Sequence, residues 1–146
     1  MNPGPSRPQR RKLTPQRFTP TGGAYSHGLS VEVGCGAVIF TTGQLAIDPE
    51  SRVVGLGDAA SQVRYVIENI EQILSEDDAG LADIVTAQMF LLDMRDYESV
   101  IDVFNEYFTA SRPPLGVVGV TGLARDGCVV ELEAVAFRSS INAQGS

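Results

Sequence analysis

The sequence over residues 128–138 is Cys-Val-Val-Glu-Leu-Glu-Ala-Val-Ala-Phe-Arg, and it predicts the long closing strand of a sheet. Successive side chains of a strand point to opposite faces of the sheet. One face carries Val130, Leu132, Ala134 and Ala136, and the other carries Val129, Glu131, Glu133, Val135 and Phe137. Both faces are substantially apolar, so we expect both to be covered in the folded assembly.

Strand and helix periodicities alternate along the chain before this strand. We expect further strands over residues 29–34, 37–42, 84–92 and 117–120. One amphipathic helix is expected after Asp58 and a second after Asp96, the latter stopped by Pro113 and Pro114. Strands that alternate with helices are typical of a mixed sheet with some parallel pairs.

Two helices can cover only one face of such a sheet. The strand over residues 84–92 is, like the closing strand, apolar on both sides. The uncovered face would expose a mixed apolar patch, which monomers rarely tolerate. A second copy of the chain is the simplest cover, so the pattern predicts a homo-oligomer.

Length and composition indicate one ordinary domain. The chain has 146 residues, of which 43% are hydrophobic and 20% charged. It contains no run of about 18 apolar residues, so we expect no membrane segment. Two distant cysteines, Cys35 and Cys128, indicate reduced thiols and a cytoplasmic location. The single histidine, His27, argues against a histidine-based metal site, and we expect no metal.

Basic and acidic residues are unevenly distributed along the chain. Residues 1–17 hold five of the 11 basic residues and four prolines, which predicts a flexible basic arm in front of a domain over residues 18–139 and a short tail over 140–146. A nucleic-acid arm or a transit peptide is the alternative reading of residues 1–17. The rest of the chain keeps 6 basic against 18 acidic residues, a net charge of −12 that repels phosphate backbones. We therefore expect no nucleic-acid partner.

Glu131 and Glu133 share one face of the closing strand. If a partner covers that face, partial burial raises a carboxyl pKa and suits acid/base work near neutral pH. The alternative is that both glutamates lie at a solvated rim or make structural hydrogen bonds, and such pairs are common in strands.

Several segments, taken in order, resemble the Rid family (YjgF-type reactive imine/enamine deaminases). Residues 23–28 (Gly-Ala-Tyr-Ser-His-Gly) resemble its Gly-Pro-Tyr-Ser-Gln/His-Ala segment, and residues 41–50 (Thr-Thr-Gly-Gln-Leu-Ala-Ile-Asp-Pro-Glu) its Val-Ser-Gly-Gln-Ile-Pro-Leu-Asp-Pro signature. Residues 90–94 and 130–136 are similar to its Val-Phe-Leu-Thr-Asp-Met run and its closing Ile-Glu-Ile-Glu-Ala-Ile-Ala strand. The resemblance covers about residues 20–138.

The resemblance implies an α+β, chorismate-mutase-like fold (ββαβαβ) with two helices on one face of a mixed sheet. It also implies a homotrimer with clefts between subunits. The best-known members hydrolyse 2-imino acids and their enamines to 2-keto acids and ammonia without a cofactor. We therefore expect a small-molecule substrate and no cofactor.

Site residues carry over from the family with two departures. The resemblance implies catalytic roles for Glu133 and Tyr25, and a substrate contact from Thr42, where the family has serine. Gly43, Gly116 and His27 are further substrate-binding candidates, and the two glycines are expected to serve backbone geometry or cleft access more than ligand binding alone. His27 is either a proton shuttle or a structural hydrogen-bonding residue. Leu115 stands where the family places the arginine that binds the substrate carboxylate, and Ile101 where it has an asparagine. Arg112, three residues upstream of Leu115, is a possible substitute cation.

Leucine cannot make the planar, charge-assisted fork that arginine makes with a carboxylate. The expected substrate is therefore a reactive imine, enamine or related metabolite without a free carboxylate, and the expected reaction is hydrolytic deamination or a tailoring isomerisation or cyclisation. One alternative is a non-catalytic ligand-binding trimer that has lost the chemistry. A weaker alternative is a ribonuclease or translation inhibitor.

Overall fold

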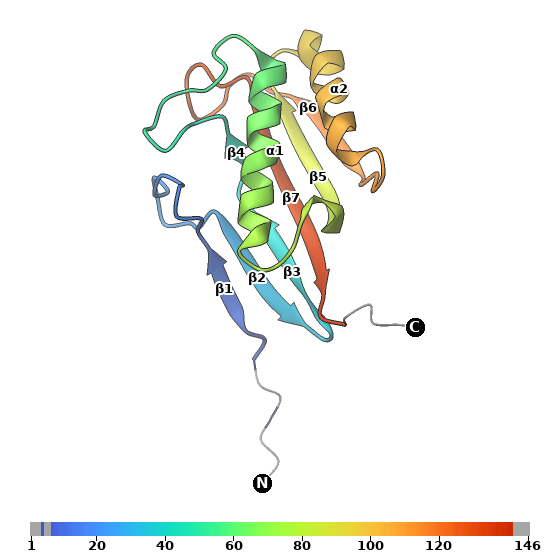
Figure 1. Cartoon of the computed structure of the whole chain (residues 1–146). Helices are drawn as coiled ribbons and strands as arrows, with labels where there is room; N and C mark the ends of the chain where they lie inside the picture. Colours follow the sequence, from blue (N-terminus) through green and yellow to red (C-terminus); the bar gives the residue numbers. More distant parts are fainter. Residues whose placement is uncertain (1–3, 5–6, 142–146) are drawn as a thin grey trace.

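The hairpin of strands β2 (Gly28–Val33) and β3 (Gly36–Thr41) starts the central sheet, and it turns through Gly34 at a φ of 54°. The structure is a computed structural model that describes residue 4 and residues 7–141. The remaining elements are β1 (Arg10–Leu13), β4 (Gln44–Leu45), α1 (Ala59–Ser75), β5 (Ile84–Leu91), α2 (Tyr97–Phe108), β6 (Leu115–Gly119) and β7 (Val130–Ser139) (Figure 1). Two short 3-10 turns, Leu81–Asp83 and Met94–Asp96, precede β5 and α2.

The sheet is mixed, as the sequence predicts. Its strands follow the order β1-β2-β3-β7-β5-β6, and β4 pairs with β7 beside that path. β5 and β6 are parallel, whereas the other pairs are antiparallel. Both helices lie over the same face of the sheet (Figure 1). The predicted arrangement of two helices on one face of a mixed sheet is thereby confirmed.

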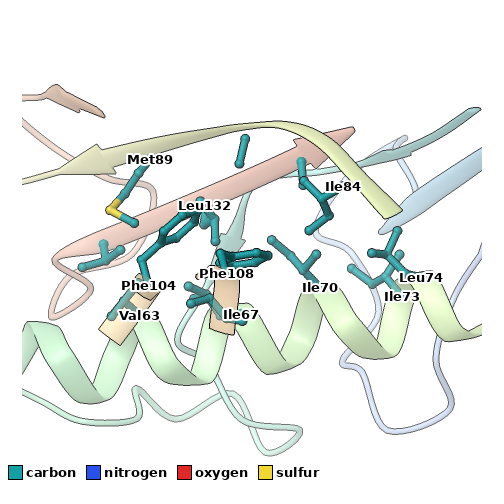
Figure 2. Close-up of a cluster of buried hydrophobic side chains, with 14 of the residues drawn as sticks. Val63, Ile67, Ile70, Ile73, Leu74, Ile84, Met89, Phe104, Phe108 and Leu132 are labelled. Carbon is teal, nitrogen blue, oxygen red and sulfur yellow. The ribbon is translucent and has the colours of Figure 1, made fainter. Parts of the chain in front are cut away.

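Helix α1 forms where the apolar spacing predicts it. The Asp58 side chain accepts a hydrogen bond from the Ser61 backbone N–H at 3.2 Å and so caps the first turn. The face toward the sheet buries Val63, Ile67, Ile70 and Leu74 (Figure 2). Phe104 and Phe108 of α2 stack at a centroid distance of 4.2 Å in the same core. Helix α2 begins at Tyr97, directly after Asp96, although the Asp96 side chain caps no backbone group.

Part of the expected flexible arm over residues 1–17 forms a strand. Arg10–Leu13 forms edge strand β1 against β2, and Leu13 is only 1% exposed within the core. One apolar side chain in a basic run gives no periodic signal, and its burial depends on contacts far away in the chain. Residues 1–3 and 5–6 of the expected arm, and 142–146 of the expected tail, lie outside the described residues.

Asp77, at the end of α1, holds β1 to the rest of the sheet. It is 8% exposed and accepts hydrogen bonds from Ser30 Oγ at 2.5 Å and Arg11 Nη2 at 2.7 Å. Arg138 of β7 lies 3.3 Å from the same carboxylate. Burial on its own raises the pKa of Asp77, but the bonds from Ser30 and Arg11 and the charge of Arg138 outweigh burial and lower it.

The face of the sheet opposite the helices remains open in the isolated chain. Large apolar side chains on it are more than a third exposed, among them Val33, Phe40, Val85, Val118 and Phe137. The uncovered apolar face expected from strand parity is therefore present. No helix within the described residues has the length and apolar character needed to cross a membrane.

Candidate functional site

Glu133 lies on the open face of the sheet in a row of three paired positions, one on each of three neighbouring strands. Its direct partner across the β5–β7 pairing is Gln88, and the partner of Gln88 on β6 is Gly116. A side chain at Gly116 would overlap the Gln88 amide, because its Cβ would lie 2.7 Å from Gln88 Oε1. Glycine at position 116 therefore leaves room for the Gln88 side chain.

A hollow of about 340 Å³ opens beside this row and is lined by Glu133, Gln88, Thr86 and Phe40 among others. The Gln88 Nε2 atom is buried and has no hydrogen-bond partner within the described part of the chain. A buried N–H without a partner is costly, so this donor is available to a group that enters the hollow. We call this space the Glu133 hollow.

Glu131 lies two residues before Glu133 on the same face of β7, where it pairs with Phe90 and Leu45. Its carboxylate rests against the α-carbon of Gly43. Burial raises the pKa of Glu131 above its ordinary value of 4.5, and the charge of Glu133 raises it further. Two carboxylates with different surroundings on one strand face are suited to separate roles in proton transfer.

A second hollow, of about 500 Å³, lies beside the segment that precedes β2, and Tyr25, His27, Thr42 and Gly43 all line it. We call it the Tyr25 hollow. The Thr42 backbone N–H donates to the His27 carbonyl at 2.8 Å, and the Thr21 hydroxyl donates to the Tyr25 carbonyl at 2.6 Å. These bonds hold the loop that carries Tyr25 against the end of β3.

One of the two ring nitrogens of His27 is hydrogen-bonded to the backbone. Its Nε2 lies 2.8 Å from the Thr19 carbonyl, which can only accept a hydrogen bond, so Nε2 carries the proton. The Nδ1 atom is buried without a partner among the described residues. The Phe18 ring meets the His27 ring edge-on at 4.9 Å. These contacts fix the tautomer and orientation of the imidazole in the wall of the Tyr25 hollow.

The two hollows have no lining residue in common among the described residues, but their linings come close in the chain at the end of β3. Thr41 lines the Glu133 hollow and its neighbour Thr42 lines the Tyr25 hollow. The Thr41 hydroxyl accepts a hydrogen bond from the Ala134 backbone N–H at 3.0 Å, which joins the end of β3 to β7. The structure thus places six of the expected site residues in two groups: Glu133 with Gly116, and Tyr25 with His27, Thr42 and Gly43.

Leu115 and Ile101 lie elsewhere. Leu115 begins β6 opposite the buried Ala87 and packs against the apolar core on the side of the helices. Ile101 is a half-buried residue of α2. Neither lines either hollow. Arg112, the substitute cation considered above, is exposed at a φ of 49° after α2 and also lines neither.

Three residues were missed as candidates from the sequence. Gln88 could have been found from strand parity once its pairing with Glu133 was known. Arg17 and Arg125 line the Tyr25 hollow from separate loops, and no periodic pattern marks them. Within the described residues, no three His, Cys, Asp or Glu side chains are grouped so that they could hold a metal ion.

Comparison with known proteins matches the profile described as Endoribonuclease L-PSP to residues 15–138. The chain is 37% identical over 99 residues to the 3-aminoacrylate deaminase RutC of Acinetobacter baylyi, covering 68% of this chain and 78% of that protein. It is 31% identical over 119 residues to the 2-iminobutanoate/2-iminopropanoate deaminase of Bos taurus, covering 82% and 83%. A crystal structure of a Thermotoga maritima protein matches 88% of this chain and 98% of its own at 31% identity, with a TM-score of 0.78.

Proposed function

We propose, starting from the fact that this chain belongs to the Rid (endoribonuclease L-PSP) family, that it hydrolyses a small reactive imine or enamine without a cofactor. Two similar proteins are deaminases of such compounds, 3-aminoacrylate and 2-iminobutanoate. The proposal places the reacting carbon in the Glu133 hollow.

The observation that carries the proposal is the position of Glu133 beside Gln88 at an open hollow, two residues from a half-buried Glu131. Hydrolysis of an imine requires a water that adds to the C=N carbon and a proton that reaches the nitrogen. Glu133 is placed to accept the proton of the attacking water and to pass it to the nitrogen, which gives a carbinolamine. Transfer of the carbinolamine hydroxyl proton to the same nitrogen through Glu133 then breaks the C–N bond, so that ammonia leaves and a carbonyl forms. The free Nε2–H of Gln88 can hold the water or the carbinolamine oxygen.

The uncharged side chain of Leu115 supports a substrate without a carboxylate on the carbon next to the imine. Leu115 has no charge and packs on the core, and Arg112 lines neither hollow. Within the part of the chain that the structure describes, no arginine or lysine lines the Glu133 hollow. An isomerisation or cyclisation of such a substrate would use the same proton transfer from Glu133.

The open face of the sheet supports a trimer in which a neighbouring subunit closes each Glu133 hollow. Exposed Phe40 and Phe137 flank the polar row, and a neighbouring copy would exclude water from the carboxylates. We place this activity in the cytoplasm, since both cysteines are free, one exposed and one buried.

The test is a coupled assay for ammonia and carbonyl release from freshly generated imines, one with and one without a carboxylate on the adjacent carbon. We expect turnover of the imine without the carboxylate and a loss of about 10²–10⁴-fold in Glu133→Gln. The matched control is Glu71→Gln, since Glu71 is exposed on α1. Wild-type protein that binds the imine but turns it over no faster than Glu133→Gln would instead be a binding protein.

A further inference from the structure

Among the described residues, the lining of the Tyr25 hollow contains two arginines and no carboxylate. The whole chain has 18 acidic residues and a net charge of −7, yet no described Asp or Glu lines this space of about 500 Å³. Arg17 reaches this space from the segment before β2, and Arg125 from the loop between β6 and β7. The remaining polar groups of the lining include Tyr25, Asn69 and Gln72, which are neutral hydrogen-bonding side chains.

Among the described arginines after residue 20, only Arg112 and Arg125 have no carboxylate within 4.0 Å, and of these two only Arg125 lines the Tyr25 hollow. Four arginines after residue 20 lie within 4.0 Å of a carboxylate: Arg52, Arg64, Arg95 and Arg138. Arg125 instead donates one N–H, from Nη2, to the Ser51 carbonyl at 2.5 Å. A guanidinium has five N–H donors, so Arg125 keeps several of them free at a position fixed by Ser51.

Because anions pair with arginine in planar, charge-assisted geometry, two arginines without carboxylate partners around one hollow form an anion-binding arrangement. We propose that Arg125 and Arg17 bind an anionic group of the ligand, a carboxylate or phosphate, in the Tyr25 hollow. This inference rests on the proposed function and extends it. The reacting C=N carbon lies in the Glu133 hollow, and the anionic group lies at the other end of the molecule.

A separate anion site would also explain how this chain can resemble relatives that act on acids although Leu115 replaces the arginine that binds the substrate carboxylate in the family. The substrate class becomes an imine or enamine with an uncharged reacting end and an anionic group several bonds away. Thr42 and Gly43 line the Tyr25 hollow, and Thr41, the residue before Thr42, lines the Glu133 hollow. The space that a side chain at Gly43 would need is filled by the Glu131 carboxylate.

The experiment is calorimetric titration of the full chain with glutarate, with inorganic phosphate and with uncharged glutaramide. We compare wild type with Arg125→Gln, Arg125→Lys and Arg17→Gln. The matched control is Arg112→Gln, since Arg112 is exposed, has no carboxylate within 4.0 Å among the described residues and lines neither hollow. Circular dichroism melting confirms that each variant is folded.

We expect one of the two anions to bind, glutaramide to bind more weakly, and Arg125→Gln to weaken anion binding about tenfold or more. Arg125→Lys should retain part of the affinity, and Arg112→Gln all of it. Equal affinity in Arg125→Gln and wild type would overturn the inference, as would an equal loss in Arg112→Gln. Because binding is measured without turnover, Glu133→Gln should bind the anion normally even though it fails in catalysis, which separates this inference from the proposed function.

Discussion

The Glu131 carboxylate occupies the space that a side chain at Gly43 would need. Gly43 directly precedes β4 and Glu131 lies on β7, 88 positions later in the chain, and the two residues meet where β4 pairs with β7. Glu131 lies two residues before Glu133 on the same face of β7, and Gly43 lines the Tyr25 hollow. Position 43 therefore determines where the Glu131 carboxylate can lie.

Substitution Gly43→Ala should displace Glu131, because the new Cβ would overlap its carboxylate. We expect the free energy of unfolding to fall by about 1–3 kcal/mol. Turnover should fall by more than the loss of folded protein at the assay temperature explains. Chemical denaturation and the ammonia assay measure the two effects. Gly122→Ala is the control, since nothing lies within 4 Å of a Cβ at Gly122. Full activity in a folded Gly43→Ala protein would contradict a role for this contact.

The raised pKa of Glu131 predicts how the stability of the fold depends on pH. A group whose pKa is higher in the folded state favours folding below its ordinary value, 4.5, and loses that contribution as the pH rises through its folded pKa. Glu131→Gln removes the titrating group and should therefore unfold at higher denaturant concentration than wild type at pH 7. The difference should shrink as the pH falls to 4.5. A constant difference across this range would show that the effect has another cause.

Much of the fold could be predicted from particular residues. Asp58 and the apolar spacing that follows it specify α1, and the alternation in residues 128–138 specifies β7 and both of its faces. These signals are local, because a cap and a periodic stripe are properties of one segment. The strand predicted over 117–120 begins two residues earlier, at Leu115, and ends at Gly119, because the pairing with β5 begins at Leu115.

The missed features all depend on contacts between distant segments. β1 is held by Leu13 in the core and by the bond from Arg11 to Asp77, 66 positions away. The partnership of Glu133 with Gln88 depends on the register of β5 against β7, which strand parity alone does not determine. Arg17 and Arg125 lie on loops, and the shape of the Tyr25 hollow is created by those loops together with α1.

Asp77 predicts the opposite pH dependence from Glu131. Its pKa is lowered in the folded state, so it stabilises the fold above its ordinary value of 3.8 and loses this contribution as the pH falls through the folded pKa. Asp77→Asn should reduce the free energy of unfolding by about 1–3 kcal/mol at pH 7 through weaker bonds to Ser30 and Arg11. The difference should close below pH 3.8. Asp78→Asn is the control, because Asp78 is exposed and asparagine tolerates its φ of 55°. An equal loss in both variants would show that Asp77 has no special role.

The open face of the sheet predicts the mass of the protein in solution. If further copies cover this face, light scattering after size exclusion should give three times the chain mass of 15.6 kDa. Phe40→Glu should shift the protein toward the single chain, because association would bury an unpaired carboxylate. The control is Tyr97→Glu on α2, since Tyr97 is 42% exposed and Phe40 45% exposed, but Tyr97 lies on the helical side. A wild-type mass of 15.6 kDa, or equal dissociation by both variants, would contradict assembly through this face. If the mass falls in Phe40→Glu alone, turnover should fall with it, because the Glu133 hollow would lose the subunit that closes it.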